Sequence, residues 1–241
     1  MSSKAVSFTD LVASLTKHSQ VLSAAAGMEI PGTAVETDTP VREMLQRAGE
    51  LVRGAAALGE QKNPCALGVL SRAVLENLIL LLWVQVHEEN AAKLNQEALS
   101  ELARVARVNF EKGKARVMNR ETGKDATSEF LQSDRFKGLK KPPSIETRAK
   151  EAGVEDLYTV FYRFMSLELH GRGLTPKGES PETASAVQMQ GIGALALASG
   201  HAGVKWLIHR ERTDNETLRQ LLGIGRPSPN KSFQPIASGG G

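Results

Sequence analysis

The chain has 241 residues, 41% of them hydrophobic and 24% charged, which is ordinary for one large domain that buries a core. Its formal net charge at pH 7 is only +3, so the total charge favours no class of partner and only the local charge is informative. The single cysteine, Cys65, excludes an internal disulfide. Because the start MSSKAVSFTDLVASL also lacks the features of a secretory signal, we expect a cytoplasmic protein.

The spacing of apolar residues predicts helices along the whole chain, and no run of alternating β-branched residues indicates a strand. A first helix is expected over residues 7–24, followed by a turn at Pro31-Gly32. Thr39-Pro40 is typical of a helix N-cap and first helical residue, so a second helix is expected from there to about Leu58. Asn63-Pro64 has the same pattern and begins a third helix.

The third helix lies in residues 63–89, NPCALGVLSRAVLENLILLLWVQVHEE, the most apolar segment of the chain. It is long enough to cross a bilayer, but it carries Arg72 and Glu76 in its middle, and a central Arg alone costs about 2.5–3.5 kcal/mol in a membrane. We therefore expect a buried core helix and no membrane span. Arg72 and Glu76 are one helical turn apart on the stripe that also carries Trp83 and His87, so both charges must be paired inside the fold.

A basic segment follows the central helix. Residues 101–150 hold 13 Lys or Arg against 7 Asp or Glu. A fourth helix is expected from about Asn95 to Met118, and the low apolar content of residues 119–143 predicts a long basic loop. The helix would carry four cations, Arg104, Arg107, Lys114 and Arg116. If this helix lies near the candidate site, we assign these cations to contact with the phosphate backbone of a nucleic acid. If it does not, we assign them to a solvated face.

The last third of the chain contains the second central helix. A short helix is expected from Ser144 to about Ala152, ended by Gly153, and the second central helix then runs over residues 154–169. A last long helix is expected over residues 180–209, where Ala194, Ala198 and Ala202 form a stripe that suits close helix contact within the monomer or across a dimer. The expected domains are an N-terminal helix and linker, a helical bundle and a disordered tail, at residues 1–38, 39–223 and 224–241.

The second central helix carries the sharpest chemical pattern, R-F-M-S-L-E-L-H. Arg163, Ser166 and His170 share one helical stripe, and we expect Glu76 near Arg163 or His170. A histidine moves protons near neutral pH, and an arginine holds a phosphate whose charge grows in the transition state. Arg163 and His170 are therefore the candidate catalytic residues, with Arg72, Glu76, Ser166 and Tyr162 in support.

This pattern resembles the R-x4-6-H motif of the HEPN superfamily, compact helical bundles that include many metal-independent ribonucleases. The early R-A-V-L-E at Arg72 and the late Y-R-F-M-S-L-E-L-H-G at Tyr162 together also look like an uncharacterised group of bacterial all-helical proteins. The resemblance implies an all-α, HEPN-like bundle of about six helices. It also implies a homodimer whose two motifs meet, and an RNA-directed activity of the defence or toxin kind. Active members commonly carry a polar residue directly after the arginine, where this chain has Phe164.

Two other interpretations remain open beside this one: a small-ligand pocket, and a non-catalytic structural role. The four polar residues Arg72, Glu76, Ser166 and His170 would then be a buried network that fixes helix packing in an interaction module. We expect no cofactor, because the G-x-G-x-x-A pattern at Gly191 does not follow a strand, as a dinucleotide-binding motif would. We expect no metal, because no carboxylate or cysteine accompanies His201 and His209 as a further ligand. Trp83 and Trp206 are expected in the core, and the sequence leaves open whether an antitoxin or other regulator binds.

Overall fold

The computed structural model describes residues 7–28, 35–87, 89–136, 138, 142–162 and 180–209. Within these ranges the fold is an all-α helical bundle without strands, which confirms the predicted class. Arg163, Ser166, His170, a last short helix that the sequence predicts over residues 215–223 and the tail lie outside the described residues.

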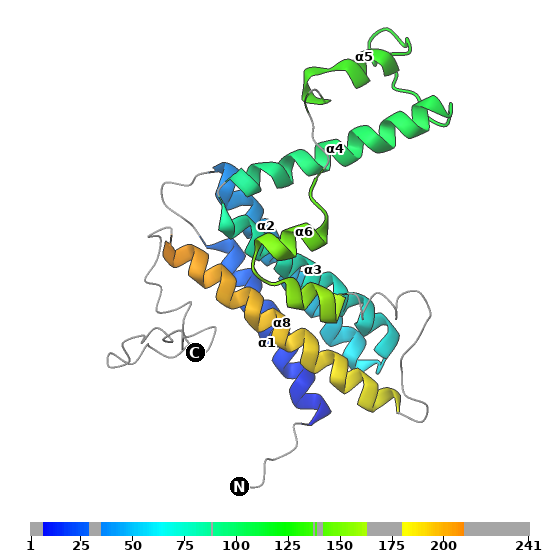
Figure 1. The fold of residues 1–241 in the computed structure, drawn as a ribbon. Coiled ribbons are helices and arrows are strands. Elements are labelled where there is room, and N and C mark those ends of the chain that lie inside the picture. Colours follow the sequence, from blue (N-terminus) through cyan, green and yellow to red (C-terminus); the bar gives the residue numbers. More distant parts are fainter. Residues whose placement is uncertain are drawn as a thin grey trace.

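Four long helices form the bundle, in which α1 packs against α2 and α8, and α3 packs against α2 and α8 (Figure 1). Shorter elements and α4 are added to one side of α3. The elements in chain order are α1 (Phe8–Gly27), α2 (Val35–Glu60), α3 (Pro64–Val86), α4 (Glu89–Glu111), α5 (Thr127–Gln132), the 3-10 turn η1 (Asp134–Phe136), α6 (Ile145–Glu151), the π-helix η2 (Leu157–Tyr162) and α8 (Pro181–His209).

The first two helices approach each other closely. Ser7 caps α1 in a capping box with Asp10, so the helix begins where the sequence predicts it. Against it, a Cβ on Gly49 of α2 would lie only 3.1 Å from the carbonyl oxygen of Ser19, so glycine permits this contact. α2 begins earlier than the expected N-cap at Thr39, and Pro40 lies inside it. As the sixth residue of α2, Pro40 lies past the first turn and lacks an N–H where the helix pattern uses one.

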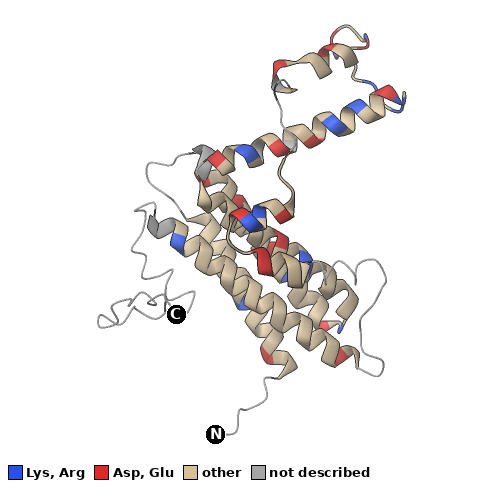
Figure 2. Cartoon of the chain, in the orientation of Figure 1, with Lys and Arg blue, Asp and Glu red and all other residues tan. Residues whose placement is uncertain are grey.

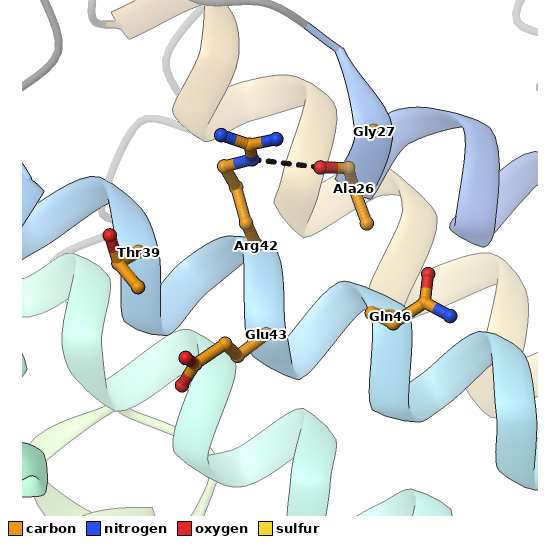
Figure 3. A pocket seen from close by; sticks show the side chains of 6 residues that line it. All are labelled: Ala26, Gly27, Thr39, Arg42, Glu43 and Gln46. Carbon is orange, nitrogen blue, oxygen red and sulfur yellow. Dashed lines mark hydrogen bonds between the residues drawn. The ribbon is translucent and has the colours of Figure 1, made fainter.

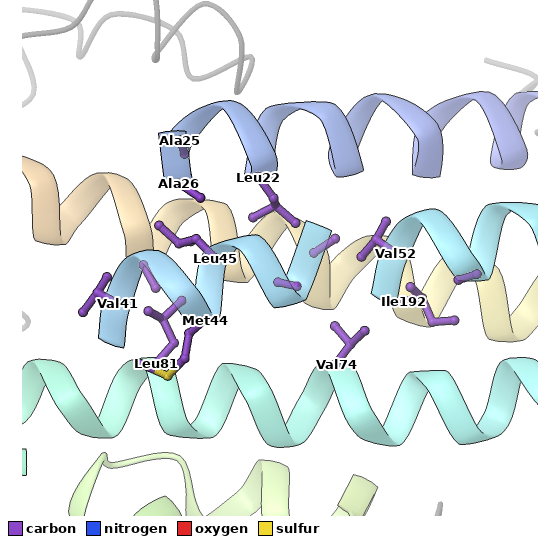
Figure 4. Close-up of a cluster of buried hydrophobic side chains, with 14 of the residues drawn as sticks. Leu22, Ala25, Ala26, Val41, Met44, Leu45, Val52, Val74, Leu81 and Ile192 are labelled. Carbon is purple, nitrogen blue, oxygen red and sulfur yellow. The ribbon is translucent and has the colours of Figure 1, made fainter. Parts of the chain in front are cut away.

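α3 is the central helix, as expected, and side chains from α2 and α8 cover it (Figure 4). Asn63 caps it by accepting from the backbone of Ala66. Trp83 is 0% exposed and Trp206 is 7% exposed, which confirms both as core residues. In the described part of the chain, α3 is long and apolar enough to cross a membrane, but 50% of that stretch is buried inside the fold. Core helices of bundles share this composition, and α3 packs as one of them.

α4 ends earlier than the sequence predicts. Gly113 adopts a left-handed φ of +64°, and Lys114 N donates to the carbonyl of Asn109 at 2.8 Å in a Schellman motif. The helix therefore stops at Glu111, and the expected extension to Met118 is wrong. Lys114 and Arg116 lie beyond the helix. The expected loop 119–143 also contains regular structure, namely α5, η1 and Asp125, which forms an antiparallel β-bridge with Met118.

The segment leading to the second central helix agrees with the prediction at its start. Ser144 caps α6, and Gly153, at φ +70°, ends it with a second Schellman motif in which Val154 N donates to the carbonyl of Ala149. The chain then continues as the π-helix η2, where a regular α-helix was expected. Its wider turn is a conformation that is rare and is concentrated at functional sites.

Candidate functional site

The hydroxyl of Tyr162 lies between the two charged residues of α3. The Nη2 of Arg72 donates to this hydroxyl at 2.9 Å, and the hydroxyl donates to Oε2 of Glu76 at 3.5 Å. The guanidinium of Arg72 also lies 4.7 Å from the centroid of the Tyr162 ring, a cation–π contact. Arg72 and Glu76 are half-buried rather than largely buried, and they are paired through the tyrosine. We call these three residues the tyrosine network.

A small apolar cluster places Tyr162 at this position. Leu75 and Ile79 of α3, both 0% exposed, pack with Ala149 of α6 and with the ring of Tyr162. Tyr158, one turn earlier in η2, stacks on Tyr162 with ring centroids 5.0 Å apart. The expected pairing of the two central helices is therefore confirmed for the part of the second one that the structure describes. The predicted contact of Glu76 with Arg163 or His170 stays a prediction.

One nitrogen of the Arg72 side chain forms no hydrogen bond within the part of the chain that the structure describes. This nitrogen is Nε, and it is buried. A buried donor of a charged group without a partner is costly, but Nε of Arg148 is in the same state, so this atom alone does not mark a ligand site. Of the other residues on the Arg72 stripe, Trp83 is fully buried and His87 is the exposed C-cap of α3.

The four predicted nucleic-acid contacts lie apart from the tyrosine network, a position for which the sequence favours a solvated face over a phosphate contact at the candidate site. Arg104 and Arg107 lie on the outer half of α4, which projects from the bundle, and Lys114 and Arg116 follow it (Figure 1). Nε of Arg104 donates to Glu101 at 2.9 Å, whereas no partner is found for Arg107 in the described part of the chain. These two arginines border an open groove of about 490 Å³ between α4, Phe136 and Pro142.

A second polar cluster, absent from the sequence-based expectations, joins α3, α4 and α6. The Nε1 of Trp83 donates to Oε2 of Glu151 at 2.6 Å, and Nη2 of Arg148 forms an ion pair of 2.7 Å with Glu97. The Arg148 side chain is only 5% exposed and stacks 4.9 Å from the Trp83 ring. No local signal marks these pairs, because their partners are 68 and 51 residues apart in the chain.

Another pocket is small and lies at the end of α1. Nε of Arg42 donates to the carbonyl of Ala26 at 2.8 Å and so satisfies an acceptor at the end of that helix (Figure 3). The surrounding space of about 280 Å³ is shallow and is bordered by Glu43 and Gln46. Its arginine already has a capping role, so this pocket offers little chemistry. Within the described ranges, no group of three or more His, Cys, Asp or Glu side chains is placed to hold a metal ion.

The fold and the tyrosine network together define an all-α bundle with a polar contact between its two central helices. The chain belongs to the family of unknown function DUF5677, whose model matches residues 38–176. That match spans α2 to η2 and continues past residue 162, so it contains both segments from which the candidate site is built, whereas α1 and α8 lie outside it. Comparison with curated proteins and with solved structures finds no significant match.

Proposed function

We propose that this protein is RNA-directed and cleaves RNA without a metal ion, by an HEPN-like route that uses Arg163 and His170. The observation that carries the proposal is the tyrosine network. The two hydrogen bonds hold the hydroxyl of Tyr162, the residue that directly precedes Arg163 in the sequence, and this adjacency supports the proposal. The same contact joins the early and late motifs that the resemblance pairs.

The chemistry needs only groups that the two motifs supply. The 2′-oxygen of the RNA forms a bond to phosphorus while the bond from phosphorus to the 5′-oxygen breaks. His170 takes the proton from the 2′-hydroxyl or gives one to the leaving 5′-oxygen, and Arg163 neutralises the phosphate. We propose that the protein is a homodimer, as in HEPN ribonucleases, so that the two copies of His170 divide these two proton transfers.

The experiment is cleavage by the purified wild-type protein in EDTA. Single-stranded RNA and tRNA should be cut to products with a 2′,3′-cyclic phosphate and a 5′-hydroxyl, and DNA of the same sequence should stay intact because it lacks the attacking hydroxyl. Sedimentation equilibrium measures the oligomeric state in the same buffer. RNA that stays intact in EDTA and is cut only after divalent metal is added contradicts the proposed route.

A second candidate function, a non-catalytic helical interaction module, is favoured by the outer face of α4. Leu102, Val105 and Val108 are 46%, 47% and 40% exposed on a helix that leaves the bundle. Large exposed apolar side chains that lie close together mark contact surfaces. On this reading the tyrosine network only fixes helix packing, so substitutions in it would lower stability and there would be no RNA cleavage to lose.

A further inference from the structure

Beyond the end of α4 the chain folds back in a short hairpin that carries most of the exposed cations of this part of the molecule. We call residues 112–124 the basic arm. Asn119 N donates to the carbonyl of Lys124 at 2.9 Å, and Ala126 N donates to the carbonyl of Val117 at 2.8 Å. The side-chain oxygen of Asn119 accepts from the backbone of Glu121 and of Thr122, which closes the turn.

The charge of the basic arm is out of proportion to that of the whole chain. The arm has five Lys or Arg and one acid, so its net +4 leaves −1 for the rest of a chain whose total is +3. Figure 2 shows basic residues at the far end of α4 and in the chain beyond it. The five cations are all exposed: Lys112, Lys114, Arg116, Arg120 and Lys124.

These cations are almost free of protein partners. In the described part of the chain, the ion pair found for them joins Arg116 Nε to Asp125 Oδ2 at 3.9 Å, with 73% and 47% of the two side chains exposed. An exposed pair at that distance contributes little. The charges of the arm are therefore available to an external anion, and their mutual repulsion is relieved when one binds.

The arm is also held firmly at its base. The ring of Phe130 in α5 packs edge-on against Phe110 of α4 and against Phe136, with centroid distances of 6.4 and 5.1 Å. Val117 N donates to the hydroxyl of Thr127, which joins the arm to the start of α5. Cations presented by a fixed support lose less conformational entropy when they bind.

We propose that the basic arm is a docking surface for the phosphodiester backbone of RNA, separate from the tyrosine network. The inference rests on the proposed RNA substrate and names the surface that holds it. A backbone fits the arm better than an anionic membrane does, because a membrane-binding surface combines cations with a broad apolar face. The arm offers Met118, 52% exposed, as its one large exposed hydrophobic side chain. Docking on the arm positions a long RNA while the reacting phosphate lies elsewhere on the protein.

The test compares two variants that each lose five positive charges. The arm variant replaces all five cations of the basic arm by Gln. The control variant makes the same change at five exposed cations on other helices: Lys17, Arg47, Arg53, Lys150 and Lys205. Binding is measured by fluorescence anisotropy of a labelled single-stranded RNA whose 2′-hydroxyls are methylated, so that cleavage by 2′-oxygen attack cannot occur. Thermal midpoints of both variants establish that they fold.

The expected result is a loss of binding that is specific to the arm. At about 50 mM salt the arm variant should bind at least about 30-fold more weakly, and the slope of log K against log salt should become less negative by about 3.5, or about 0.7 for each cation. The control variant should bind within about 3-fold of wild type and keep most of the slope.

Three results overturn the inference. The arm variant binds the RNA as tightly as wild type does, or wild type does not bind this RNA at low salt. In the third, the arm variant loses binding to phosphatidylserine vesicles and still binds the RNA. The separate cleavage assay on unmodified RNA keeps the two proposals apart. If the arm binds RNA and no RNA is cut, the docking surface stands and the cleavage proposal fails.

Discussion

Replacing Tyr162 by Phe removes one oxygen atom and with it both hydrogen bonds that join Arg72 to Glu76. A hydrogen bond to a charged group contributes about 1.5–3 kcal/mol. Because both charged residues are half-buried and the bond to Glu76 is long, at 3.5 Å, we expect a total loss near the low end, about 1.5–2 kcal/mol. The phenyl ring keeps its apolar packing and its contact with the guanidinium, so the effect isolates the hydroxyl.

Urea unfolding followed by circular dichroism measures this loss, with an unchanged m-value as the sign that the unfolded state is unaffected. The matched control is the same Tyr162→Phe change in an Arg72→Met background, where it should cost less because one of its two partners is already gone. A cost below about 0.5 kcal/mol in the wild-type background, which is ordinary for a surface substitution, refutes the view that the hydroxyl joins the central helices.

Three further predictions concern other parts of the fold. Arg148→Met removes the partner of Glu97, whose side chain is 29% exposed, and should lower the free energy of unfolding by about 1.5–3 kcal/mol in urea titration, whereas a neutral result shows that the pair is dispensable. Gly113→Ala forces a side chain into a left-handed conformation and should cost about 1–2 kcal/mol, seen as a lower thermal midpoint; no change contradicts the Schellman motif. Burial lowers the pKa of His18 in the folded protein below its ordinary value of 6.5, and the charge of Lys17 lowers this pKa further. As the pH falls below 6.5, the unfolded chain takes up a proton at His18 before the folded protein does. The contribution of His18 to stability is therefore full above pH 6.5 and is lost as the pH falls through the folded pKa. His18→Gln should therefore flatten the fall of the thermal midpoint between about pH 7.5 and 5, and an unchanged slope refutes this.

The sequence predicts those features of the fold that local chemistry decides. Asn63 and Ser144 each cap the helix that the sequence predicts to begin at them, because a side chain that can accept from the backbone stands directly before the first apolar residues. Gly153 ends α6 for an equally local reason. The end of α4 was missed because the apolar residues continue past Gly113 at helical spacing, and a period alone does not show that the backbone turns left-handed at a glycine.

The candidate site divides in the same way. The spacing of Arg72 and Glu76 on an apolar helix predicts that they need a polar partner from the second central helix, and Tyr162 is that partner. Two other contacts could not be predicted: that of Trp83 with Glu151 and that of Arg148 with Glu97. They depend on how α3, α4 and α6 pack, and the spacing of residues along the sequence does not determine that packing. The wider turn of η2 likewise has no signal in its sequence, since the same residues suit an α-helix.

The central claim, that Arg163 and His170 act on RNA without a metal, is tested most directly by measuring cleavage and stability together in His170→Ala. His201, which is exposed on α8, provides the matched control His201→Ala. We predict that His170→Ala lowers the cleavage rate in EDTA by about 10²–10⁴-fold, while its thermal midpoint stays close to that of wild type and His201→Ala cuts RNA normally. A large fall in the midpoint of His170→Ala, together with a wild-type protein that leaves RNA intact, contradicts the claim and identifies the histidine as part of the scaffold.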